Sequence, residues 1–214
     1  VVLYGVLSVP AIRHYRRVGA KASGVMPAFR DVIRGIWILK TRSPIAWHRL
    51  AVYWLIVDVV TGVMYFSPMY MGETLGIEQR TIGIVLLTTQ AIAFPATVAV
   101  ASLAHRLGVV VTIRLCLVGW VVALGLMFAA RDLTGVLVAM VPIVFVIGST
   151  QALLRAHFAQ RVAQADAGVG FGYYAVAQKG ATVFTPLLVA AIAYQTGSAR
   201  LVFPVLGGMV LLCL

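Results

Sequence analysis

Residues 109–130 of this chain read VVVTIRLCLVGWVVALGLMFAA, and Arg114 is the only charged residue among them. As an α-helix this run would be about 33 Å long, which matches the roughly 30 Å hydrocarbon core of a bilayer. Further apolar runs of bilayer length lie at about 50–70, 81–103, 133–154 and 170–194, with shorter ones at 1–12 and 200–214. The sequence therefore predicts an all-α polytopic membrane protein.

The composition agrees with a membrane protein. Hydrophobic residues make up 62% of the 214 residues and charged residues only 11%, whereas about a quarter of the residues of a soluble domain are charged. The net charge of +11 could suggest nucleic acid, but the basic residues flank the apolar runs. Membrane topology and lipid headgroups explain them better, and we expect no nucleic-acid partner.

The basic residues also predict the sidedness of the chain. Alternate connections between the apolar runs hold 13 Lys and Arg residues on one side and 3 on the other, and Lys179 lies inside a run. The positive-inside rule places the richer side in the cytoplasm. The basic connections alternate sides only if every proposed span crosses the membrane. The charge count therefore supports the number of spans independently of hydropathy.

The order of these segments predicts the domain organisation. Residues 1–12 resemble the end of a preceding transmembrane helix, 13–49 a basic cytoplasmic linker, and 50–214 a six-helix bundle with its last helix truncated. Within the linker, apolar residues from Phe29 to Trp37 fall on one helical face, which predicts a helix on the membrane surface. We expect the chain to be a fragment, with the N-terminal half of the same protein as a missing partner.

No pattern for chemistry at a metal or an active site is present. Cys116 and Cys213 lie inside apolar runs, without a His or second Cys at ligand spacing. No paired carboxylates and no Ser/His/Asp set occur on converging segments. We therefore expect neither enzyme activity nor a metal or other cofactor.

Four short motifs carry a resemblance to a known family. Residues 101–108, ASLAHRLG, resemble the Gly-x-Leu-Ala-Asp-Arg-x-Gly loop motif of the major facilitator superfamily. Three others resemble motifs of its vacuole-effluxer-like branch: residues 148–155 (GSTQALLR, followed by Phe158), residues 170–179 (GFGYYAVAQK) and residues 58–61 (DVVT). The chain departs from the patterns where His105 replaces Asp, Leu154 replaces Ser and Val59 replaces Gly.

The resemblance implies the C-terminal half of a twelve-helix transporter, from a branch whose fungal members export amino acids from the vacuole. It also implies that His105, Arg106 and Gly108 form the loop that helps to latch the cytoplasmic face. A neutral His105 would weaken that latch. Gln151 and Arg155, near the cytoplasmic end of their span, would belong to a gate or a helix cap.

Asp58 and Lys179 are ionisable residues deep inside two apolar runs. A charge in hydrocarbon costs roughly 2.5–3.5 kcal/mol on insertion scales, so it is retained when paired, hydrated or functional. Asp58 follows Arg49 by nine residues and Lys179 follows Gly170 by nine, which predicts similar depths from the same side. The pair could exchange a salt bridge for a proton or substrate. It could equally be a static pair, or the two residues could make no contact, with Lys179 extending toward the interface.

Three uncharged polar residues complete the predicted site. Gln90 and Gln178 either line the solute path or form hydrogen bonds between helices. Tyr65 either faces a cavity or anchors the chain at the membrane interface.

The sequence thus predicts a secondary transporter fragment that moves a small solute, with amino acids as one class, by alternating access in a bacterial inner membrane. Its surroundings would be membrane lipids and the missing half of the protein. The alternative is a non-transporting scaffold or sensor of the same fold, which would use the basic segment 13–49 to bind a partner or anionic lipid.

Overall fold

The computed structural model describes residues 44–159, 185–192, 194–195 and 197–214. In these ranges the chain is helical and contains no strand. The long helices are α3 (Pro44–Met69, continued by the π-helix η1, Tyr70–Thr74), α4 (Gln79–Leu107), α5 (Val109–Ala129) and α6 (Leu133–Ala159). Residues 185–192 and 194–195 are helical, and the 3₁₀ turn η3 (Ala199–Leu201) leads into α8 (Val202–Leu211).

Four described segments are long and apolar enough to cross a membrane: Ala51–Thr74, Gln79–Leu107, Val109–Ala129 and Leu133–Phe158. The prediction of an all-α polytopic membrane protein is therefore confirmed. The helices extend beyond most of the apolar runs: α4 reaches Leu107 where the run ended near residue 103, and α6 reaches Ala159 where it ended near residue 154. A helix can continue past the hydrocarbon because its main-chain N–H and C=O groups bond to each other within the helix, whatever its side chains are.

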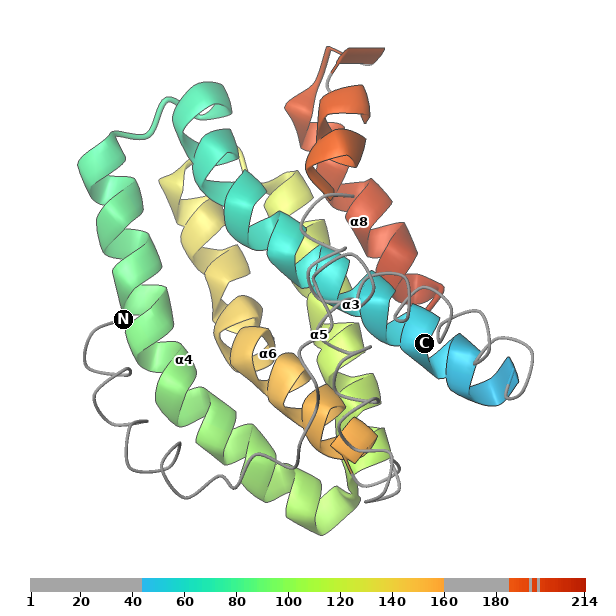
Figure 1. Cartoon of the computed structure of the whole chain (residues 1–214). Helices are drawn as coiled ribbons and strands as arrows, with labels where there is room; N and C mark the ends of the chain where they lie inside the picture. The colour runs from blue at the N-terminus through green and yellow to red at the C-terminus, as the bar shows by residue number, and fades with distance from the viewer. Residues whose placement is uncertain (1–43, 160–184, 193, 196) are drawn as a thin grey trace, which may run out of the picture. The chain divides into compact units, whose positions relative to one another are not determined.

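The helices are joined by short links. Gly108 alone separates α4 from α5, and residues 130–132 separate α5 from α6. Links of this length make successive helices antiparallel neighbours. In Figure 1, α4 and α6 run beside each other, α5 packs on α6 and α8, and α3 packs on α8 and α6.

The core lies around α5. Trp120, which is 0% exposed, donates a hydrogen bond from Nε1 to Thr150 Oγ1 on α6 at 3.0 Å. A Cβ at Gly119 would lie 2.7 Å from Val146 Cγ1, so α5 and α6 approach closely there. Small residues permit this kind of close helix packing in membranes.

A second cluster ties three helix ends together. The Arg200 guanidinium donates from Nε to the Tyr70 hydroxyl at 3.0 Å and from Nη2 to the Ala130 carbonyl at 2.6 Å. Tyr70 also packs edge-on against Phe203 of α8, with ring centroids 4.9 Å apart. These contacts join η1, the end of α5 and the start of α8 at one end of the bundle.

Several predictions fall outside the described residues. They concern segment 1–12, most of linker 13–49 with its surface helix, and the motif at 170–179 with Gln178 and Lys179. They stay predictions, as does the scaffold alternative, which depends on the linker.

Candidate functional site

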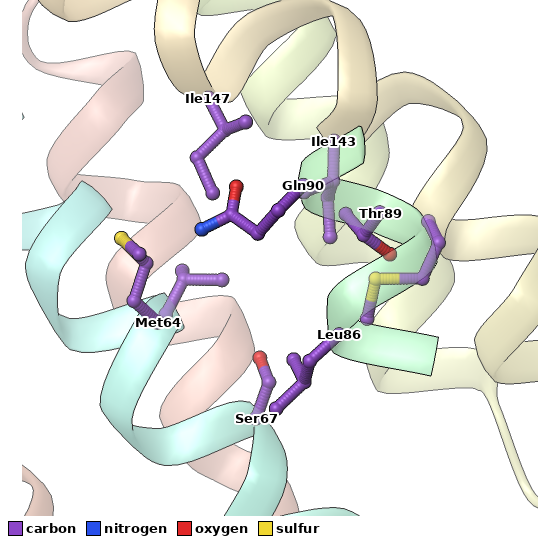
Figure 2. Close-up of a pocket in the computed structure, with 9 residues that line it drawn as sticks. Met64, Ser67, Leu86, Thr89, Gln90, Ile143 and Ile147 are labelled. Carbon is purple, nitrogen blue, oxygen red and sulfur yellow. The ribbon is translucent and has the colours of Figure 1, made fainter. Parts of the chain in front are cut away.

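One hollow lies between α3, α4 and α6. Two adjoining cavities, of about 140 and 370 Å³, share Met64, Gln90 and Ile147 in their linings. Figure 2 shows the smaller cavity, into which Gln90 projects from α4 between Met64 and Ile147. The two cavities together form one hollow, called the α3/α4/α6 hollow below.

Polar groups in this hollow are few and uncharged. Ser67 Oγ is buried and has no hydrogen-bond partner among the described residues. The hydroxyl of Thr89 is occupied, since it donates to the Val85 carbonyl at 2.7 Å, and Thr97 donates likewise to Ala93. The Gln90 amide is therefore the exposed polar group of the smaller cavity, and the Ser67 hydroxyl lies buried in its lining. Pockets that are largely apolar with a few convergent polar groups are typical binding sites.

The motif at 148–155 contributes both packing and lining. A Cβ at Gly148 would collide with Thr97 Oγ1, so the glycine brings α6 against α4 beside the larger cavity. Thr150 is buried and donates to the Val146 carbonyl at 2.6 Å while it holds Trp120. Gln151 is partly exposed and lines the larger cavity, whereas Arg155 is exposed near the end of α6.

Asp58 lies apart from this hollow, on the side of α3 that faces residues 185–192. It is 0% exposed. Its Oδ1 accepts a hydrogen bond from the Thr185 main-chain N–H at 3.1 Å, and its carbonyl accepts one from Thr185 Oγ1 at 2.9 Å. The described partner of Asp58 is thus a neutral threonine six residues after Lys179.

Tyr65 lines a third cavity, of about 250 Å³, between α3 and residues 185–190. The side chain is 69% exposed. Because Met64 and Ser67 point to the α3/α4/α6 hollow while Tyr65 lines the opposite side of α3, the structure does not bring Tyr65 and Gln90 into one cavity. The predicted site is therefore divided between two faces of α3.

The motif predicted as a cytoplasmic loop is mostly helical. His105 and Arg106 occupy the last turn of α4, where both are exposed, and Gly108 caps the helix with φ +88° and ψ 148°. In the described part of the chain, neither His105 nor Arg106 forms an ion pair. The motif thus shapes a tight helix-to-helix turn.

Sequence reasoning missed Ser67, Gly62 and Thr185. Ser67 is a small polar residue in an apolar run, which by itself indicates little. Gly62 follows Asp58 by four residues, so both lie on one helical face, and a Cβ there would collide with Thr185 Cγ2. That spacing was the available signal for a close approach beside Asp58.

No group of three His, Cys, Asp or Glu residues suited to a metal occurs among the residues that the structure describes.

Comparison with known proteins adds a family and a relative. Residues 17–214 match the model of the family described as "Vacuole effluxer Atg22 like". The chain is 27% identical over 207 residues to an uncharacterized MFS-type transporter, YxiO, of Bacillus subtilis (strain 168). That alignment covers 92% of this chain and 46% of the relative, so the chain spans about half of the relative's length. No solved structure matches the chain.

Proposed function

Because the chain belongs to the vacuole effluxer Atg22-like family, we propose that it forms half of a secondary transporter that moves a small solute across a membrane. The chain is an integral membrane protein with four described helices of spanning length. The match to an MFS-type transporter supports transport rather than enzyme chemistry.

The observation that carries the proposal is the α3/α4/α6 hollow. It is lined by residues of three spanning helices, and the exposed Gln90 projects into it. Secondary transporters bind their solutes near mid-membrane at the interface of two repeats, which then rock against each other. We infer that this hollow is one wall of the solute path, with the N-terminal half of the protein as the other wall.

The proposed solutes are amino acids or similarly small molecules, and the proposed direction is export. The family description, an effluxer, supports export, and the solute class follows from the motif resemblance at residues 58–61 and 148–155. The hollow suits an uncharged part of such a solute, because none of the described residues that line it is charged. The bacterial relative supports a plasma-membrane location.

The test is transport by the full-length protein in vesicles, with Gln90→Leu as the variant. Leucine keeps much of the volume but removes the amide, so the apparent affinity for the solute should fall about fivefold, corresponding to about 1 kcal/mol for one hydrogen bond. The matched control is Gln79→Leu, the same change at the exposed first residue of α4, where no described cavity is lined.

Radiolabelled amino acids in a counterflow assay measure the affinity. Equal transport by the Gln90→Leu and Gln79→Leu variants would place the solute path elsewhere. Absence of counterflow by the wild type with every amino acid would refute this solute class.

A further inference from the structure

Asp58 and Thr185 form two hydrogen bonds between α3 and residues 185–192. The main-chain N–H of Thr185 donates to Asp58 Oδ1, and Thr185 Oγ1 donates to the Asp58 carbonyl. Both residues are buried. We call this pair of bonds the Asp58–Thr185 clasp.

The clasp uses a main-chain donor. The N–H of Thr185 is a main-chain group, so its bond to Asp58 joins α3 to the backbone of residues 185–192. The next residue, Pro186, has no N–H. The carboxylate of Asp58 thus holds the main chain of Thr185 from a neighbouring helix.

The second oxygen of the same carboxylate has nothing to bind. Asp58 Oδ2 is buried and lacks a hydrogen-bond partner among the described residues. A buried polar atom without a partner costs free energy, and an intramembrane carboxylate is a candidate functional site for this reason. Oδ2 can therefore accept a small ligand, while the Thr185 N–H holds Oδ1 in place.

The described surroundings of Asp58 contain few ionisable groups. Residues 185–192 and α8 have none. The sequence of α3 contains His48, Arg49, Tyr53 and Tyr65, that of η1 contains Tyr70 and Glu73, and α6 carries Arg155 and His157 in its last two turns. Lys179 lies outside the described residues. Among the described elements packed on α3, nothing charged is in ion-pair contact with Oδ2.

The third cavity, of about 250 Å³, lies beside the clasp. Gly62 and Thr185 both line it. A side chain at Gly62 would collide with Thr185, so the glycine permits both the clasp and the cavity next to it. The cavity therefore leaves space for water next to Thr185, the residue that binds the Asp58 carboxylate.

We propose that Asp58 Oδ2 is the site of the proton that is exchanged in the transport cycle. The proposal rests on the transport function proposed above. A proton from water forms one O–H bond at Oδ2 and changes the charge of the side chain from −1 to 0. Hydrogen bonds to a carboxylate are roughly twice as strong as those to a neutral group, so protonation weakens the bond from the Thr185 N–H to Oδ1 and loosens α3 against residues 185–192. The bond from Thr185 Oγ1 goes to the main-chain carbonyl and keeps its strength.

Infrared difference spectroscopy of the purified full-length protein during a pH titration tests the proton site without any solute. Other carboxyl groups also protonate as the pH falls, so the readout is the difference between the wild type and Asp58→Asn. The wild type should show a carboxylic-acid component that Asp58→Asn lacks, and Gln90→Leu, which alters the proposed solute path, should keep that component. Identical carboxylic-acid bands in the wild type and Asp58→Asn would overturn the proposal.

Variants of Thr185 test the clasp and cover the case in which Asp58→Asn does not fold. Thr185→Val removes Oγ1, whose bond to the Asp58 main-chain carbonyl helps to hold the Thr185 N–H against Oδ1, so the pH at which the band appears should shift. Thr185→Ser keeps the hydroxyl and should give the wild-type midpoint. An unchanged midpoint in Thr185→Val would show that the clasp does not act on the proton. In vesicles, Asp58→Asn should lose the dependence of transport on a pH gradient but keep counterflow, and loss of both would refute its coupling role.

Discussion

Gly108 allows α4 and α5 to follow each other with one residue between them. Its φ of +88° and ψ of 148° lie in a region that is essentially restricted to glycine. Its N–H donates to the Ala104 carbonyl at 3.0 Å, and its own carbonyl accepts from Thr112 at the start of α5. This residue therefore ends one helix and helps to cap the next.

Replacing Gly108 with alanine should destabilise the protein by about 1–3 kcal/mol, because a side chain strains this backbone conformation. The matched control is Gly125→Ala inside α5, where φ is not positive and nothing lies within 4 Å of the new Cβ. That change should be stabilising by roughly 0.5–1 kcal/mol. Unfolding in detergent measures the free energy of unfolding of both variants. An equal change in the two variants would contradict this account of Gly108.

The single residues of the family-like motifs have different structural roles. Thr150 holds Trp120 in the core, Gln151 lines the larger cavity, and His105 is exposed at a helix end. A motif read along the chain therefore mixes positions that pack the core with positions that line the proposed solute path. Only the contacts of each side chain separate the two kinds.

At the scale of the helices, α4 and α6 are held together where Gly148 meets Thr97. This close approach borders the larger cavity and sets the spacing between two of its three walls. The width of the proposed solute path thus depends on one glycine.

Gly148→Ala should destabilise the packing of α4 on α6 by about 1–3 kcal/mol, as overpacking of a filled core does. The collision involves the Thr97 hydroxyl, so adding Thr97→Ala should restore most of the lost stability, since its Oγ1 bond to Ala93 lies within one helix. Thermal unfolding of the two single variants and the double variant measures this coupling. Additive losses would show that the two residues do not compete for the same space.

The helices themselves were predictable, and their ends less so. Each described apolar run became a helix because a lipid-exposed backbone must satisfy its own hydrogen bonds. The sequence predicted the ends of α4 and α6 several residues before Leu107 and Ala159, where the helices end. Hydropathy indicates where the hydrocarbon ends, and the hydrogen bonds of a helix can continue beyond that point.

At the scale of the whole molecule, the two ends of the bundle should face opposite sides of the membrane. Glu78 precedes α4 and His105 lies in its last turn, and both are exposed. The charge count assigns the end at His105 to the cytoplasm. The structure places the two residues at opposite ends of one spanning helix.

In a full-length protein without other reactive cysteines, Glu78→Cys should react with an impermeant maleimide on intact cells. His105→Cys should react only after the membrane is opened. The pattern follows from the positive-inside rule, because 13 of the 17 basic residues lie on the proposed cytoplasmic side. The reverse labelling pattern would show that the orientation is inverted.

The sequence alone determined the number and approximate limits of the described spanning helices and the family to which the chain belongs. It did so because hydrocarbon imposes a length of apolar helix, and because the motifs at 58–61 and 148–155 are local. Only the tertiary structure decided which polar residues meet: Gln90 with Ser67 in one cavity, and Asp58 with Thr185 on the opposite side of α3. The physical reason is that lipid-facing and buried positions of a spanning helix are both apolar, so periodicity does not reveal which face turns inward.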